Sequence, residues 1–412
     1  MAGKFPKAKQ RGVKLQGTDT QPDMRLGVLD VGSQSAHLCI ADLAPGCPPE
    51  PVTSFKRPVR LAEATNRHGV VEPEAIKRVV AAVTEAVAVA EAHGIDAMVP
   101  FATSAIRDAA NRPAVLAEVE DATGVRLTFM TGEEEARLTY LAARGWYGWS
   151  AGEMLLLDIG GGSMEIACGS RAEPAVALSV PLGAGRLTRH HLPDTTPVRK
   201  RDVKALRQFV RTVISETVEE LRDRPEPLTR VGTSRTFAQL ARLTGAPKAK
   251  AGPYAERFLD RERLRAWVPR LAARSDAERA RLRGISAARA HQALAGAVVA
   301  ETAMEVLGIE RLRVCPWALR EGVLLDRLRA LEADLAPGRV DRRDRGGAER
   351  GGADPGVTTA SANVSASATV GAPGGASAGA AANASASASV RALPAGRGRH
   401  GPGRLHTVPW TS

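Results

Sequence analysis

Two hydrophobic patterns alternate along the chain between residues 24 and 335. Short apolar runs predict buried strands, and they lie at 26–29, 97–102, 125–130, 154–157 and 312–314. Apolar residues that recur every three or four positions predict amphipathic helices, at 73–93, 113–123, 202–222, 255–274, 287–307 and 318–335. This part of the chain is therefore expected to be folded, and its polar turns are where we look for chemistry.

Two of the predicted strands end in the same kind of polar turn. The sequence after 26–29 reads Asp30-Val-Gly-Ser-Gln-Ser35, and after 154–157 it reads Asp158-Ile-Gly-Gly-Gly-Ser-Met-Glu165. Glycines let consecutive backbone N–H groups turn toward an anion. The candidate phosphate ligands are Gly32, Ser33, Gln34, Ser35, Gly160, Gly161, Gly162 and Ser163. Two such turns predict a duplicated domain with a cleft between its halves.

The acids of these turns point to a cation. Asp158 and Glu165 flank the glycines and would repel a bound phosphate unless a cation lay between them, which suggests Mg²⁺. On the residues alone, a glycine-rich hairpin turn with two solvated acids explains the second stretch equally well.

Two further segments could contribute to such a site. Thr131-Gly-Glu-Glu-Glu135-Ala-Arg137 opens a predicted helix, where Thr131 can cap and acids suit the helix dipole. Capping explains at least two of the three glutamates and leaves room for one base. Gly232, Thr233 and Ser234 form another strand-to-helix turn, a weak candidate for anion binding by itself.

Composition narrows the setting. The net charge is +12 and the pI is about 10.0, which favours an anionic partner: nucleic acid, a membrane surface or polyphosphate. The four cysteines have neither metal-ligand spacing nor the density of a disulfide framework. No secretory signal is visible and no apolar run approaches the ~20 residues of a membrane helix. We therefore expect a cytoplasmic protein that does not enter the membrane.

The two ends of the chain read differently from its middle. Residues 1–23 form a basic polar arm, and 336–412 form a low-complexity tail with no charged or aromatic residue from 355 to 390. Both are predicted to be disordered. Two domains, 24–150 and 151–335, are predicted between them.

Taken in order, these motifs resemble those of the exopolyphosphatase / guanosine pentaphosphate phosphatase (Ppx/GppA) family, in its short form. Besides the turns above, the resemblance rests on Ala102-Thr-Ser-Ala-Ile-Arg107 and Pro181-Leu-Gly-Ala-Gly-Arg186, and it spans about 25–331. It implies an α/β protein with the duplicated actin-like/sugar-kinase (ribonuclease H-like) two-domain fold. The active site would lie in the interdomain cleft, with Mg²⁺ as cofactor.

The resemblance also implies roles for individual residues. Glu135 would be the catalytic base for the attacking water, Asp30, Asp158 and Glu165 would hold Mg²⁺, and Arg107 would contact phosphate. Two positions depart from the family pattern: Gln34 replaces a usual Asn, and Arg235 replaces a frequent glycine. Because Gln34 is one methylene longer than Asn, the affinity for phosphate or the preferred length of the polyphosphate could differ from the family pattern. Arg235 either contacts substrate or points to solvent.

The function we expect is a Mg²⁺-dependent exopolyphosphatase, which hydrolyses terminal phosphate from inorganic polyphosphate. The alternatives are a pppGpp 5′-phosphohydrolase, an ATP-dependent kinase or chaperone of the same fold, and a non-catalytic regulator that binds polyphosphate or a nucleotide. Neither a membrane nor nucleic acid is expected as a partner. The family suggests a homodimer.

Overall fold

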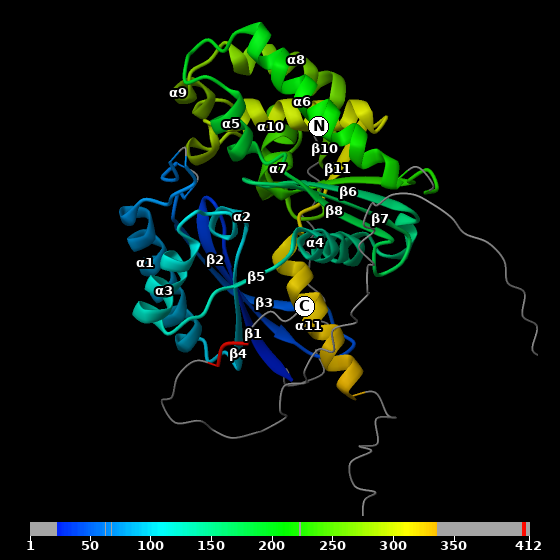
Figure 1. Cartoon of the computed structure of the whole chain (residues 1–412). Coiled ribbons are helices and arrows are strands. Elements are labelled where there is room, and N and C mark those ends of the chain that lie inside the picture. Colours follow the sequence, from blue (N-terminus) through cyan, green and yellow to red (C-terminus); the bar gives the residue numbers. More distant parts are fainter. Residues whose placement is uncertain (1–22, 62, 67, 222–223, 336–405, 409–412) are drawn as a thin grey trace, which may run out of the picture.

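A computed structural model describes residues 23–335, except 62, 67, 222 and 223, together with 406–408 (Figure 1). The predicted basic arm, apart from Asp23, and most of the predicted tail lie outside the described residues. His406–Val408 differ from the expectation of a disordered tail, because they pair with the first sheet.

The two halves each contain a sheet with the same strand arrangement. The first sheet has the order β3-β2-β1-β4-β5, and the second β10-β11-β9-β6-β7-β8. Its strands are β1 (Met24–Val31), β2 (Ser35–Leu43), β3 (Glu50–Pro58), β4 (Ala97–Ala102) and β5 (Thr128–Phe129). The second sheet contains β6 (Met154–Ile159), β7 (Met164–Gly169), β8 (Val176–Val180), β9 (Thr229–Thr233), β10 (Phe258–Asp260) and β11 (Arg311–Val314). In both, three consecutive strands form an antiparallel meander and two later strands, β4 and β5 or β9 and β11, add in parallel. The second sheet has one further strand, β10, which pairs antiparallel with β11. The duplication predicted from the two turns thus extends to the sheets.

Helices cover both faces of each sheet (Figure 1). They are α1 (Pro73–Ala92), α2 (Ser104–Arg107), α3 (Arg112–Thr123), α4 (Gly132–Tyr147), α5 (Ala184–His191), α6 (Lys200–Val218), α7 (Ser234–Leu243), α8 (Arg261–Ala272), α9 (Asp276–Ala280), α10 (Ala293–Val306) and α11 (Leu319–Leu335). Short 3₁₀ turns lie at Trp149–Ala151, Glu219–Leu221, Ala249–Ala251 and Ala287–Arg289. Helices α1 and α3 pack on one face of the first sheet, and α6, α8 and α10 pack on one face of the second.

Helix α4 lies between the two sheets and belongs to both cores. Leu138 and Leu141 pack with the first sheet and α11, whereas Ala136 and Tyr140 pack with β6, β7 and β9. Its apolar residues therefore occupy two faces of one helix. Helix α11, the last in the folded part, crosses back to cover the first sheet (Figure 1).

Three predicted elements differ in extent from those in the structure. The helix expected over 255–274 starts only at Arg261, because Phe258–Asp260 pair with β11 and Asp260 then caps α8. The helix expected over 287–307 begins at Ala293 after a 3₁₀ turn. The strand expected over 125–130 pairs only at Thr128–Phe129, although Val125 and Leu127 are buried beneath α1 and α3. In the described part of the chain, no helix is long and apolar enough to cross a bilayer.

Candidate active site

The two glycine turns have the same hydrogen bond and lie against each other. Gly32 N–H donates to the Ser35 carbonyl at 3.1 Å, and Gly160 N–H donates to the Ser163 carbonyl at 2.9 Å. A Cβ atom added to Gly161 would collide with the side chain of Ser33, so only glycine lets the turns approach this closely. The turn of each half thus forms one wall of the cleft.

Three carboxylates lie at these turns. Asp158 and Glu165 are directly opposite each other in the β6–β7 ladder, an arrangement that is destabilising for like charges. Burial raises the pKa of Asp158 to about 6, with repulsion from Asp30 adding to the shift. Burial also raises the pKa of Glu165 well above its usual value, and repulsion from Glu135 and Asp158 adds to that shift. Asp30, at the end of β1, also has a raised pKa because it is buried. Its Oδ2 accepts from Arg320 at 2.9 Å, while its buried Oδ1 has no partner among the described residues.

Glu135 is the one glutamate of the α4 start that faces this acidic cluster. Glu133 is exposed. The carboxylate of Glu134 accepts two hydrogen bonds from Arg137, and the backbone N–H of Glu134 donates to the capping hydroxyl of Thr131. Glu135 is only 8% exposed and its Oε2 accepts from Arg107 Nη1 at 3.1 Å. Burial raises its pKa to about 7 against the opposing effect of Arg107. A carboxyl group with that pKa can exchange a proton near neutral pH.

The third turn is built into the second core by its side chains. Gly232 is packed against the Phe237 ring, and Thr233 donates to the Trp317 carbonyl at 2.7 Å. Ser234 has a φ of 76° and donates to the Ile159 carbonyl at 3.0 Å, next to Asp158. The left-handed backbone of a non-glycine residue is strained and is often found at functional sites. Because the hydroxyls of Thr233 and Ser234 already donate to backbone carbonyls, the backbone N–H groups of this turn are the better candidates for substrate contact.

Gln34 is buried in the first turn without a partner. It is 7% exposed, and neither its side-chain nitrogen nor its oxygen has a hydrogen bond among the described residues. Its backbone carbonyl accepts from Val59 and Arg60 and fixes the turn. A desolvated amide without a partner is costly unless a ligand pairs with it.

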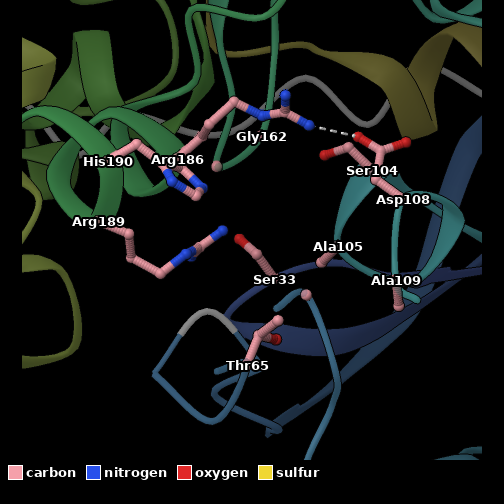
Figure 2. A pocket seen from close by; sticks show the side chains of 12 residues that line it. Ser33, Thr65, Ser104, Ala105, Asp108, Ala109, Gly162, Arg186, Arg189 and His190 are labelled. Carbon is pink, nitrogen blue, oxygen red and sulfur yellow. Dashed lines mark hydrogen bonds and ion pairs between the residues drawn. The ribbon is translucent and has the colours of Figure 1, made fainter. Parts of the chain in front are cut away.

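A cavity of about 130 Å³ lies beside the two turns (Figure 2). Its walls come from both halves and include Ser33, Gly161, Arg186 and Arg189, and Figure 2 shows Arg189 pointing toward Ser33. Arg186 Nη2 also donates to Asp108 at 3.0 Å and so bridges α5 and α2 across the cleft. No Phe, Tyr or Trp lines this cavity.

Several cations near the acids were not identified as site residues from the sequence. Arg320 on α11 reaches Asp30, and positive charges from Arg235, Arg289 and Lys56 act on one another in the same region. Among the described residues, Arg235, Arg289 and Lys56 have no ion-pair partner. Burial, together with Arg235, lowers the pKa of Arg289 to about 10. Arg235 departs from the family pattern, but no local motif marks Arg320, Arg289 or Lys56, and only the fold brings these three to the cleft.

A family model for Ppx/GppA phosphatases matches residues 39–331. The chain belongs to the Ppx/GppA phosphatase family. This confirms the predicted family and the predicted class of enzyme, a phosphoanhydride hydrolase.

Individual relatives of this Ppx/GppA protein include both curated sequences and solved structures. Exopolyphosphatase 1 of Mycobacterium tuberculosis H37Rv is 47% identical over 311 residues, which cover 76% of this chain and 90% of that protein. Exopolyphosphatase 2 of the same strain is 30% identical, with 73% and 98% covered. The crystal structure of the Aquifex aeolicus Ppx/GppA protein matches with a TM-score of 0.62 at 26% identity, covering 75% of this chain and 98% of that one. These structures confirm the predicted actin-like two-domain fold.

The acids of this Ppx/GppA site fit a divalent cation. Asp30 has a buried oxygen without a partner, and Asp158 and Glu165 repel each other in the absence of a positive charge. In the described part of the chain, no three His, Cys, Asp or Glu side chains lie close enough to enclose a metal ion jointly. Mg²⁺ is commonly held by one or two carboxylates together with water and substrate phosphates, so a cluster of three protein ligands is not required.

Proposed function

We propose that this protein is a Mg²⁺-dependent exopolyphosphatase, which releases the terminal orthophosphate of inorganic polyphosphate. One observation carries the proposal: a buried group of acids, with Glu135 beside it, lies between two anion-binding turns and is bordered by cations from both halves. Arg186 and Arg189 line the cavity by the turns. Arg289 and Arg320 provide positive charge near Asp158, and Arg235 lies near Arg289. A linear polyanion needs positive charge along its length on both sides of the bond that breaks.

In the proposed reaction, Glu135 orients a water molecule and takes its proton as the water oxygen attacks the terminal phosphorus. The P–O bond to the next phosphate breaks, and the shortened chain leaves as an anion while orthophosphate is formed. Arg107 holds Glu135 in place and can contact the transferred phosphoryl group. The backbone N–H groups of the two turns stabilise its oxygens. Mg²⁺ would be held by one or two of the acids Asp30, Asp158 and Glu165 together with phosphate oxygens, and it would neutralise phosphate charge.

The lining of the cavity favours polyphosphate over pppGpp. A guanosine would be expected to stack on an aromatic ring or to use an apolar surface, and the cavity wall has no Phe, Tyr or Trp, with the small imidazole of His190 as its one aromatic ring. The relatives named exopolyphosphatase 1 and 2 support the same choice. Phosphate release from polyphosphates of several lengths, pppGpp and ATP, measured side by side with and without Mg²⁺, tests the substrate and the metal together. Faster release from pppGpp than from any polyphosphate, or full activity after chelation, would contradict the proposal.

The role of Glu135 gives the first prediction. Glu135→Gln keeps the shape of the side chain but cannot accept the proton, so kcat should fall by about 10²–10⁴-fold. Glu133→Gln is the matched control, because Glu133 is exposed on the same helical turn, and its kcat should stay within about twofold of the wild type. Similar losses in both variants would show that helix capping, not proton transfer, explains the effect.

The proposal extends to the setting of the enzyme. We propose a cytoplasmic location, which is supported by four cysteines that are all free and is tested by fractionating cells. We also propose a homodimer, to be measured by light scattering of the purified protein.

A further inference from the structure

The edge of β4 is only partly covered by β5. Strand β5 has two residues, and they pair with Phe101 and Ala102 at the C-terminal end of β4. At the other end, the C-terminal segment of the chain takes the place of a strand. Met98 N–H donates to the His406 carbonyl at 2.9 Å, and Val408 N–H donates to the Met98 carbonyl at 2.8 Å. These two bonds form a parallel bridge between Met98 and Thr407, and Figure 1 shows the segment in red beside β4.

The position of this bridge follows from the residues of β4. In a strand, alternate residues direct their N–H and C=O groups to the same edge. Two residues beyond Met98 is Pro100, which has no N–H, and its carbonyl already accepts from Thr128 Oγ1 at 2.9 Å. Between Ala97 and Pro100, Met98 is therefore the residue whose N–H and C=O groups both point to this edge and are both available to pair with another strand.

The side chain of Val408 adds an apolar contact. It packs against the core cluster between the first sheet and the helices α4 and α11. Met98 itself is fully buried. Open strand edges tend to pair with other chains, and here the chain covers its own edge.

We propose that His406–Val408 are a built-in edge strand, which docks on β4 of the same molecule and fastens the C-terminal tail back to the first sheet. Two hydrogen bonds and one valine make a weak contact between separate molecules. Docking within one molecule does not have to offset the translational and rotational freedom that two separate molecules lose on association, so these few contacts are enough to hold the segment.

Hydrogen exchange of the Met98 amide tests the docking without using enzyme activity. The full chain is compared with a protein that ends at Leu405, which retains the tail and its arginines and lacks only the docked residues and the last four. The Met98 amide should exchange at least about tenfold faster in the shortened protein, because its acceptor is gone. The amide of Val231, in the second sheet, should exchange at the same rate in both.

Two point variants make the test specific to the register. Val408→Pro removes the N–H that donates to Met98 and should reproduce the fast exchange of the shortened protein. Thr407→Pro is the matched control, because the Thr407 N–H makes no hydrogen bond in the described part of the chain, and Met98 should stay protected. Equal Met98 exchange in all four proteins would overturn the proposal. Recovery of Met98 protection in the shortened protein when it is mixed with the full chain would overturn docking within one molecule and show docking on a second copy.

Discussion

The ion pair between Arg320 and Asp30 offers a sharp test of how the last helix contributes to the site. Arg320 lies on α11 and donates to Asp30 on β1 at 2.9 Å, with side-chain exposures of 25% and 15%. Replacing Arg320 with Met keeps the length and apolar stem of the side chain but removes the charge. Asp30 is then left buried with neither oxygen paired, since its Oδ1 already lacks a partner.

Removing one partner of a buried ion pair typically costs about 3–5 kcal/mol of folding free energy. Because both side chains reach some solvent, we expect about 3 kcal/mol for Arg320→Met. For domains of this size that corresponds to a fall in Tm of about 6–12 °C. Adding Asp30→Asn removes the buried negative charge, so the double variant should recover a large part of the lost stability. It should not recover activity, because Asp30 is proposed to hold Mg²⁺.

Arg329→Met is the control for this experiment. Arg329 lies on the same helix and pairs with Glu173, but their side chains are 40% and 54% exposed. Exposed pairs contribute about 0–1 kcal/mol, so its Tm should change by at most about 4 °C. Thermal unfolding of the four proteins at one pH and salt concentration decides the matter. A Tm for Arg320→Met as high as that for Arg329→Met would refute the reasoning.

Three further predictions follow from the cations and from the first turn. Arg235→Gln and Arg289→Gln should each raise KM for long polyphosphate several-fold, and the increase should shrink in high salt, which initial rates at two salt concentrations would reveal. Burial and the nearby Arg320, Lys56 and Arg235 lower the pKa of His37 from 6.5 to about 3, so its contribution to stability is complete above pH 6.5 and is lost as the pH falls toward 3. His37→Gln should therefore lose less Tm than the wild type between pH 7 and pH 4; an equal loss would refute this. Gln34→Met should raise both Tm and KM, because it removes a buried unpaired amide that we expect to meet phosphate; unchanged KM would argue against that contact.

The local elements of this fold could be predicted from the sequence because they depend on local patterns. Helix α1 begins at Pro73 and ends before Gly94, as the spacing of its valines and the flanking residues indicate. The start of α8 could not be predicted, since Phe258–Asp260 become a strand only through pairing with β11, more than fifty residues later. Thr407 likewise gains its structure from Met98, which no pattern in the low-complexity tail indicates.

The site divides in the same way between local and long-range information. The paired turns and their acids are contiguous motifs, and the structure places them together. Among the three glutamates at the start of α4, the sequence left the choice to the family resemblance, whereas burial and Arg107 single out Glu135. Arg320 and Arg289 have no motif around them. Their position near the acids results from how α11 and the turn before α10 cross the cleft.

The placement of α4 has a mechanical consequence for the enzyme. Because Leu138 and Leu141 are embedded in one core and Ala136 and Tyr140 in the other, the position of Glu135 on the first turn of this helix depends on the packing of both halves. A substitution that loosens either core should therefore displace the proposed proton acceptor, even where the substituted residue lies far from the cleft.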